Sequence, residues 1–142
     1  MKGEAFLEIA QKLMRMRTEP AMRSGVSRAY YAAYNAYIQL LNELGFQFSK
    51  DSPAHEKVYQ YLNNAAITEI KEAAETLRAL RRRRNRADYD MITTAFQNHL
   101  ECQFDLAHAQ AIISQIEKYS KEPLCTQLRN GLREYQTKIN AA

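Results

Sequence analysis

Apolar side chains recur every three or four residues along most of the chain, which is the spacing of helices that bury one face. Near the N-terminus this spacing predicts a helix over residues 3–17, ending where Thr18-Glu19-Pro20 interrupts the pattern. The face that this helix buries is expected to consist of Phe6, Ile9, Ala10, Leu13 and Met16.

The most apolar part of the chain, residues 21–44, carries two neighbouring apolar stripes instead of one. A helix with two apolar stripes is usually central to a bundle, because other helices cover it from more than one side. Gly45 follows in the position where a glycine often ends a helix. The first stripe contains Val26, Tyr30, Ala33, Tyr37, Leu40 and Leu44, and the second contains Tyr31, Tyr34, Ile38 and Leu41.

The rest of the chain shows the same helical spacing. Further helices are predicted from Pro53 to about Asn63, over residues 67–87, from about residue 95 to Tyr119, and from Leu124 onwards. Ser52 and Thr94 are the expected N-caps of the first and third of these. The helix after Thr94 is expected to bury Phe96, Leu100, Phe104, Ala107, Ala111 and Ile112. The last helix is expected to bury Leu124, Leu128, Leu132, Tyr135 and Ile139.

No segment shows the two-residue alternation of a strand, and a composition with four Gly, three Pro and no Trp also favours helix. The predicted fold is all-α, an antiparallel up-and-down bundle of about five helices with an extra C-terminal helix. Residues 1–120 are expected to form the bundle, and residues 121–142 a helical extension packed on the same domain.

The two cysteines, Cys102 and Cys125, have neither the density of a disulfide-rich secreted domain nor the spacing of metal ligands. The chain starts without the apolar run of a signal peptide, and no stretch approaches the ~18 apolar residues of a membrane span. We therefore expect a cytoplasmic protein that uses no metal or other cofactor and does not enter a membrane.

Positive charge is concentrated in one segment, Leu77–Asp90, which holds six of the twelve arginines. These six contribute +6, whereas the whole chain has a formal charge of +4, so all other charged residues sum to 4 − 6 = −2. A negatively charged partner is therefore expected at this segment. Its arginines are Arg78, Arg81, Arg82, Arg83, Arg84 and Arg86.

Helical spacing separates one of these arginines from the others. The inward stripe of Leu77 and Leu80 continues to Arg84, where a leucine would be expected. A guanidinium on a core-facing line needs a partner or a ligand, because burying an unpaired charge is costly. Asp88, one turn later, is the nearest candidate partner, and a phosphate bound in a cleft is the alternative. The arginines expected at flanking or outer positions are Arg82, Arg83 and Arg86.

Other residues that can carry chemistry give weaker indications. His99 and His108 share a helix without a metal-ligand pattern, so structural or surface roles are expected for them. His55 opens the short third helix beside a loop, which suits a titrating group, although a surface or capping role is the default. Ser24 and Ser27 lack the glycines of a nucleophile elbow, and the four glycines form no phosphate-binding loop.

Two short segments lie in order on the predicted bundle, Ser-Arg-Ala-Tyr-Tyr at residues 27–31 and Arg-Asn-Arg-Ala-Asp-Tyr at residues 84–89. Together they resemble the HEPN domain family. His55, within Ser-Pro-Ala-His-Glu-Lys-Val, matches a position where related sequences often carry histidine. The resemblance covers residues 3–118, and the two motifs in this order on a helical bundle are fairly specific.

The resemblance implies an up-and-down helical bundle that forms a homodimer, with paired arginine-bearing helices across a shared cleft. Many HEPN proteins are metal-independent RNA endonucleases of toxin–antitoxin, abortive-infection or CRISPR-type defence systems. Others bind RNA or partner proteins without catalysis, often beside a small nucleotidyltransferase. RNA, a second copy, and an antitoxin or nucleotidyltransferase are therefore the expected partners.

The nucleases of this family carry an arginine, usually followed by a polar residue, with a histidine four to six residues beyond the arginine. Arg84 and Asn85 match this start, but no histidine follows, and Tyr89 stands at the commonest spacing. Tyrosine is a poor general base at neutral pH because its pKa is near ~10. The candidates for catalysis are Arg84, Asp88, Tyr89 and His55, and those for RNA binding are Arg81, Arg82, Asn85, Arg86 and Arg28. We expect an RNA-binding protein with weak or lost nuclease activity; an active ribonuclease and a protein-binding module are the alternatives.

Overall fold

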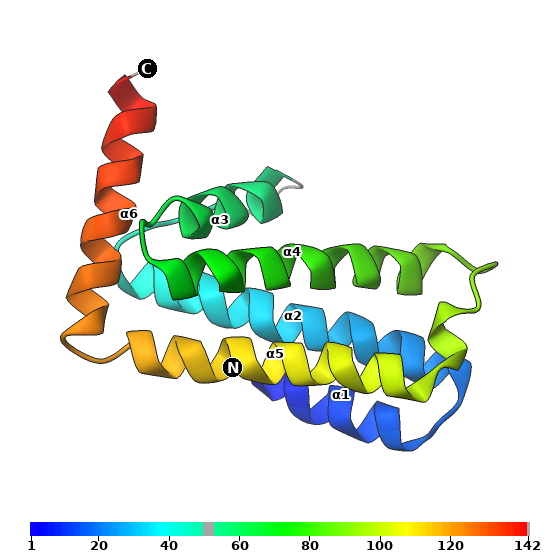
Figure 1. The fold of residues 1–142 in the computed structure, drawn as a ribbon. Helices are drawn as coiled ribbons and strands as arrows, with labels where there is room; N and C mark the ends of the chain where they lie inside the picture. Colours follow the sequence, from blue (N-terminus) through cyan, green and yellow to red (C-terminus); the bar gives the residue numbers. More distant parts are fainter. Residues whose placement is uncertain (50–52, 142) are drawn as a thin grey trace.

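The structure, a computed structural model, describes residues 1–49 and 53–141, which form six α-helices and one 3₁₀ turn (Figure 1). The elements are α1 (Ala5–Arg15), α2 (Glu19–Glu43), α3 (Pro53–Asn63), α4 (Thr68–Tyr89), η1 (Ala95–Gln97), α5 (His99–Tyr119) and α6 (Leu124–Ala141). No strand occurs in these described ranges, and the predicted all-α helical bundle is confirmed. The predicted N-cap Ser52 lies outside the described residues.

Helix α2 is the centre of the bundle, as its two apolar stripes predict. It packs on α1, α4 and α5, which run alongside it in Figure 1, while α6 lies across one end. Fifteen of its 25 residues are buried, including Tyr30 and Tyr37. The Tyr37 hydroxyl donates a hydrogen bond to Oε1 of Gln115 at 2.9 Å, so this buried phenol has the partner that it needs.

The start of α2 lies two residues before the predicted one. Thr18 caps the helix, because its Oγ1 accepts a hydrogen bond from the backbone N–H of Ala21 at 3.4 Å. Pro20 lies in the first turn, where its missing N–H has no intrahelical partner to lose. Arg17, in the left-handed region with φ 54°, turns the chain between α1 and α2. Pro20 therefore starts a helix as well as separating two.

The buried face of α5 is wrong in the prediction. Leu100 and Phe104 are 63% and 56% exposed, and Ala107 and Ala111 are also exposed. Of the residues predicted to be buried on this helix, only Ile112 enters the core. The residues of α5 that are buried are Cys102, Asp105, Leu106, Ala109, Ile112, Ile113 and Tyr119.

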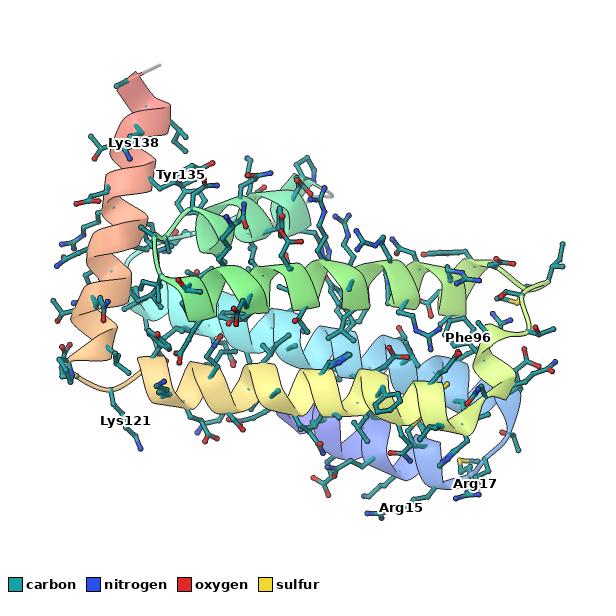
Figure 2. All side chains as sticks on the ribbon, in the orientation of Figure 1. Arg15, Arg17, Phe96, Lys121, Tyr135 and Lys138 are labelled. Atoms are coloured by element: carbon teal, nitrogen blue, oxygen red, sulfur yellow. The ribbon has the colours of Figure 1, made fainter. Side chains whose placement is uncertain are left out.

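An irregular turn explains this error. The prediction treats residues 95–119 as one helix capped by Thr94, so that Phe96 sets the phase of its apolar face. Phe96 is indeed buried, but it lies in η1, at the end of the bundle where α4 gives way to α5 (Figure 2). Asn98 is extended (φ −89°, ψ 103°) and caps α5 by accepting a hydrogen bond from the N–H of Glu101 at 3.1 Å. This extended residue resets the helical phase.

Two smaller differences concern α1 and α4. On α1, Ile9 and Met16 are 45% and 62% exposed, and Met14 is buried beside Ala10, so the predicted face is rotated. Helix α4 continues to Tyr89, beyond the predicted end at residue 87. The arginine segment is therefore helical almost throughout, which fixes the direction of each of its side chains.

Helix α6 packs on α3 and α5 through Leu128 and Leu132, both with no exposed surface. Gly131 lies so close to the loop after α3 that a Cβ atom there would be 2.0 Å from the carbonyl oxygen of Ala65. In Figure 1 the last turns of α6 extend beyond α3, and Ile139, predicted to be buried, is 42% exposed.

Candidate functional site

Arg84 leaves α4 on the side that faces α2, with 17% of its side chain exposed. Its Nη2 donates a hydrogen bond to the Tyr31 hydroxyl oxygen at 2.5 Å, and its Nη1 donates to Oδ1 of Asn85 at 2.7 Å. Its Nε lies 3.1 Å from Oδ2 of Asp88, an ion pair whose geometry is not that of a hydrogen bond. The ion pair between Arg84 and Asp88 that the sequence suggests is therefore present. The same guanidinium also forms a hydrogen bond with Tyr31 of the central helix.

Asp88 is held from α2 as well as from α4. The Ser27 hydroxyl donates a hydrogen bond to Oδ2 of Asp88 at 3.2 Å, and the same oxygen pairs with Arg84. Asp88 follows Arg84 by one turn of α4, so its carboxylate can reach the arginine. Through Ser27 the same carboxylate also contacts the central helix α2. A carboxylate occupied in this way is poorly placed to take a proton from a ribose hydroxyl.

His55 enters this region from the first turn of α3. Its Nδ1 is 2.5 Å from the Tyr30 hydroxyl oxygen, and its ring stacks on Tyr34 with the ring centroids 4.2 Å apart. Burial, and then the guanidinium groups of Arg81 and Arg84, lower the pKa of His55 to about 4. Burial also raises the pKa of Tyr30 above its usual range, so this phenol keeps its proton and donates a hydrogen bond to Nδ1. At pH 7 the imidazole is neutral.

Arg81 has the least satisfied guanidinium of the group. Its Nε is buried, and no acceptor in the described residues forms a hydrogen bond with it. Nor does any described carboxylate form an ion pair with Arg81, in contrast to Arg84. Arg81, His55 and Tyr30 line a gap of about 10 Å³, room for about one water molecule. A single chain therefore has a narrow gap at this position and no deep cleft.

The ring of Tyr31 brings a third arginine to the site. The guanidinium carbons of Arg84 and Arg28 lie 5.0 and 5.6 Å from its centroid, within the range of cation–π attraction. Tyr89 is 74% exposed, with its ring centroid 5.9 Å from the Arg84 guanidinium. The predicted site residues that the structure brings together are Arg28, His55, Arg81, Arg84, Asn85, Asp88 and Tyr89.

Arg82 and Arg86, the other two predicted RNA contacts, lie apart from this group. Both are exposed, and Arg86 donates a hydrogen bond from Nη2 to the Thr93 hydroxyl at 2.8 Å. Arg86 lines a groove between α4 and α5, whereas His55 lies on the side of α2 and α3. These two arginines can attract an anion over a distance, but they do not share the gap beside His55.

Arg83 does not have the flanking position that the sequence predicts. Its Nε and Nη2 donate to the carboxylate of Asp105, with a shortest distance of 2.6 Å, and the two side chains are only 21% and 7% exposed. The ring of Phe96 lies 4.5 Å from its guanidinium carbon. Arg83 follows Leu80 by three residues, so it shares the inward side of α4, but toward α5. It belongs to the contact between these helices.

Arg23, which is not among the predicted site residues, caps α4. Its Nη1 donates to the carbonyl oxygens of Arg86, Ala87 and Asp90 at 3.3, 3.0 and 2.7 Å, and its Nη2 donates to that of Thr93 at 3.1 Å. The Arg86 carbonyl also accepts a hydrogen bond from the N–H of Asp90 at 2.9 Å. The carbonyls of Ala87, Asp90 and Thr93 lie past the last intrahelical donor, so the guanidinium takes the place of water there. Arg23 is 8% exposed and therefore fixes the end of the helix that carries Arg84.

A pattern in the sequence does point toward this arrangement. Arg23, Ser27 and Tyr31 recur at four-residue intervals, which places one arginine and two hydroxyl groups on a single line of α2. In the structure this line faces α4: Arg23 binds its last carbonyls, Ser27 binds Asp88, and Tyr31 binds Arg84. A polar line on an otherwise apolar central helix is the signal that identifies the partner helix.

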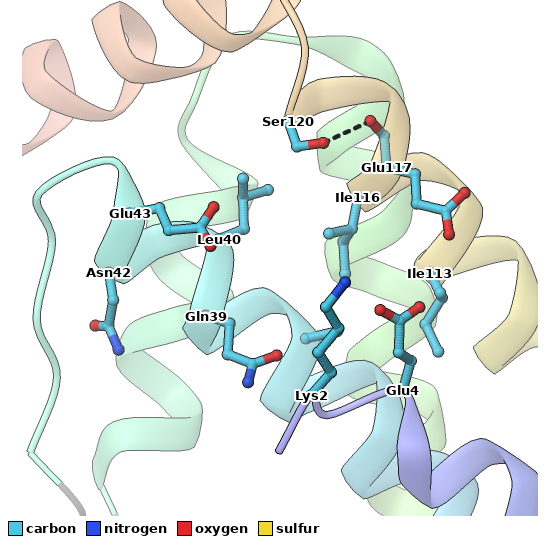
Figure 3. Close-up of a pocket in the computed structure, with 11 residues that line it drawn as sticks. Lys2, Glu4, Gln39, Leu40, Asn42, Glu43, Ile113, Ile116, Glu117 and Ser120 are labelled. Atoms are coloured by element: carbon cyan, nitrogen blue, oxygen red, sulfur yellow. Dashed lines mark hydrogen bonds between the residues drawn. The ribbon is translucent and has the colours of Figure 1, made fainter.

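A larger pocket, of about 390 Å³, lies away from all of these residues (Figure 3). It is bounded by the start of the chain, the second half of α2 and the end of α5. Its charged residues have both signs, since Lys2 lies near Glu4, Glu43 and Glu117. None of the predicted site residues lines it, and it has no excess of positive charge with which to attract an anion.

No cluster of three or more His, Cys, Asp or Glu side chains placed to hold a metal ion occurs in the part of the chain that the structure describes. Within the same part, no helix has the length and apolar character needed to cross a membrane. Comparisons of the chain with protein-family models, with curated proteins and with solved structures find no match.

Proposed function

We propose that the protein is a HEPN-type RNA-binding protein of a toxin–antitoxin or other defence module, with weak or lost nuclease activity. The observation that carries this proposal is the buried Nε of Arg81, which forms no hydrogen bond with the described residues and lies one turn from Arg84. Buried polar groups are rarely left unsatisfied, so this atom on a cationic helix supports a site for an anion.

A phosphate group of RNA has the chemistry that these residues need. Its oxygens accept hydrogen bonds from guanidinium groups, and two arginines one turn apart can bind one phosphate or two successive ones. No described carboxylate forms an ion pair with Arg81, so a phosphate would displace none there, whereas Arg84 is already paired with Asp88. We therefore assign the main phosphate contact to Arg81 and a shared one to Arg84. The exposed Arg82 and Arg86 add attraction that weakens with salt.

An active metal-independent ribonuclease is the second candidate, and the position of His55 favours it. No histidine lies four to six residues after Arg84 in the sequence. His55, however, comes from α3 close enough to Arg81 and Arg84 for both to lower its pKa. Because Tyr30 donates to Nδ1, the neutral ring carries its proton on Nε2, so Nδ1 must release Tyr30 before His55 can take a proton from a ribose hydroxyl. With a pKa of about 4 it is a weak base, so slow cleavage is the expected form of this activity.

The resemblance to HEPN proteins also supports a homodimer and an antitoxin or nucleotidyltransferase partner, and we include both in the proposal. The unpaired arginines of α4 can bind an acidic surface of such a protein in place of RNA. Co-purification of a partner without nucleic acid would favour this use of the site over RNA binding.

The decisive experiment titrates a fluorescently labelled single-stranded RNA with the protein at several salt concentrations. We expect binding that weakens steeply as salt rises, and Arg81→Ala should reduce the affinity at least tenfold and lower the salt slope by about one. Arg133→Ala, which removes an exposed arginine of α6, serves as the matched control and should change the affinity little. Absence of binding by the wild-type protein at low salt would contradict the proposal.

The same RNA, followed by gel electrophoresis, separates the two candidate functions. Binding without cleavage is the result expected of the first. Cleavage that is lost in both Arg84→Ala and His55→Gln would establish the second. Cleavage that survives both substitutions would place any nuclease activity elsewhere in the molecule or in a contaminant.

A further inference from the structure

His55, which lines the gap beside Arg81, carries a hydrogen-bond donor that no described residue uses. Because the Tyr30 hydroxyl donates to Nδ1, the single proton of the neutral ring lies on Nε2. Nε2 forms no hydrogen bond with the described residues. An imidazole held in this tautomer offers an N–H to a ligand at Nε2 and accepts no proton there. The contact with Tyr30 therefore makes His55 a donor suited to an anion.

Arg81 adds the donors of a guanidinium to the same gap. It forms no hydrogen bond with the described residues, and its Nε is buried. Arg81 comes from α4 and His55 from the first turn of α3, two helices that pack side by side (Figure 1). Among the described residues that line the gap, the one carboxylate is that of Glu56, which already contacts Arg78 and Gln60. The gap therefore holds donors in excess of acceptors, as a site for an anion requires.

The width of the gap selects among the phosphates of an RNA strand. Its volume of about 10 Å³ holds about one water molecule, and a single phosphate oxygen is of similar size. An internal phosphodiester carries a ribose on each side, and both riboses would meet the walls formed by α3 and α4. A terminal phosphate carries a ribose on one side alone, so its free oxygens can enter while the nucleotide stays outside. The shape of the gap therefore favours the end of a strand.

The charge around the gap gives the same order of preference. Arg84, one turn from Arg81, is paired with the Asp88 carboxylate at 3.1 Å, so a phosphate that recruits Arg84 competes with that carboxylate. An internal phosphodiester has the same single negative charge as Asp88. A terminal phosphate carries about −1.5 to −2 at pH 7 and has three strong acceptor oxygens. It therefore competes for Arg84 more strongly than an internal phosphate does.

We propose that Arg81 and His55 bind a terminal phosphate monoester of RNA in preference to an internal phosphodiester, with Arg84 as a secondary contact. This inference rests on the proposed function, because it names the part of the RNA that enters the same site. A 5′-phosphate and a 3′-phosphate share this chemistry, and the experiment distinguishes them. In this arrangement the imidazole keeps its proton and donates it in a hydrogen bond, so binding needs no proton transfer.

Fluorescence anisotropy with one short single-stranded RNA, labelled on an internal base, tests the preference at a fixed salt concentration. The same sequence is prepared with a 5′-phosphate, with a 3′-phosphate, and with hydroxyl groups at both ends. We expect one or both phosphorylated forms to bind at least tenfold more tightly than the hydroxyl form, a difference of about 1.4 kcal/mol. A hydroxyl RNA that is about two nucleotides longer carries the same total charge as the phosphorylated forms. It is the matched control and should bind within about twofold of the shorter hydroxyl RNA.

Substitutions identify the groups that create the preference. Arg81→Met removes the donors, and Arg81→Lys keeps the charge without the buried Nε, so both should reduce the preference to below about threefold. His55→Leu removes the Nε2 donor and should reduce the preference severalfold, whereas His55→Gln keeps a neutral donor and should retain more of it. Arg82→Met, at an exposed position of α4, should weaken all of the RNAs alike and keep the ratio between them. Circular dichroism melts show that the variants fold.

The hydroxyl RNA separates this inference from the proposed function. If the hydroxyl RNA binds and the phosphorylated forms bind no more tightly, the inference is overturned while RNA binding stands. A preference that the longer hydroxyl RNA reproduces reflects total charge alone and also overturns it. A preference that survives Arg81→Met places the terminal phosphate elsewhere on the molecule, with the same consequence. If none of the RNAs binds at low salt, the proposed function itself fails.

Discussion

Replacing Arg23 by methionine tests whether one buried guanidinium holds the end of the arginine-bearing helix. Arg23 donates four hydrogen bonds to backbone carbonyls between residues 86 and 93 and pairs with Glu19 at 3.1 Å. Methionine keeps the length and the apolar part of the side chain but removes every donor. The carbonyls of Ala87, Asp90 and Thr93 then need water, which reaches them poorly because Arg23 is only 8% exposed.

The expected loss follows from the number of bonds. The Arg86 carbonyl keeps the N–H of Asp90, so three carbonyls lose their donor. At a net value of about 1 kcal/mol for each of these three, we expect Arg23→Met to lower the free energy of unfolding by about 3 kcal/mol. Arg23→Lys keeps the charge but lacks the planar fork, so a loss of about 1.5 kcal/mol is expected. Urea unfolding followed by circular dichroism measures both values.

The control is Arg82→Met, which removes an exposed arginine of the same helix and should change the free energy of unfolding by less than ~0.5 kcal/mol. Amide hydrogen exchange should also become faster at the end of α4 in Arg23→Met, before the rest of the bundle is affected. A loss below about 1 kcal/mol in Arg23→Met would show that water caps α4 as well as the guanidinium does, and would refute the reasoning.

Three further substitutions or conditions test other contacts. Burial and two neighbouring arginines lower the pKa of His55 to about 4, so the unfolded chain, with a histidine pKa near 6.5, takes up the proton first. The free energy of unfolding should therefore fall as pH falls from about 6.5 to 4, by roughly 1–2 kcal/mol for this partly exposed ring, and His55→Gln should remove that part of the pH dependence. Asp105→Ala leaves the half-buried Arg83 with only its longer ion pair to the exposed Glu101, at 3.9 Å, and should lower the free energy of unfolding by about 2–4 kcal/mol. Adding Arg83→Met should recover much of the loss in the same urea assay. Gly131→Ala forces α6 away from the Ala65 carbonyl and should lower the free energy of unfolding by about 1–3 kcal/mol. An unchanged free energy of unfolding would show that α6 can shift freely.

The parts of the fold that follow from local spacing could be predicted from the sequence. The two apolar stripes of α2 predict its central position, and the line from Leu77 and Leu80 predicts that Arg84 points inward. The face of α5 could not be predicted in this way, because a single extended residue, Asn98, resets the phase between η1 and α5. Spacing rules assume an unbroken helix, and nothing around Asn98 marks the break strongly.

The site was predictable only where its contacts lie within one helix. The pair of Arg84 and Asp88 is separated by four residues, so the sequence alone indicates it. The contact between His55 and Tyr30, and the capping of α4 by Arg23, depend on how three helices pack. No local pattern sets the angle at which α3 crosses α2, and the acceptors of Arg23 are backbone atoms, which every sequence has.

The hydrogen bonds of Arg23 also bear on how the protein emerges from the ribosome. They join positions 63 to 70 residues apart in the sequence, so the chain must be synthesised beyond Thr93 before α4 is capped. Until then the nascent chain presents a strongly cationic segment, without its fixed end, beside ribosomal RNA. The surface that we propose for RNA binding therefore takes its shape only after the three preceding helices have been synthesised, while the last two are still to come.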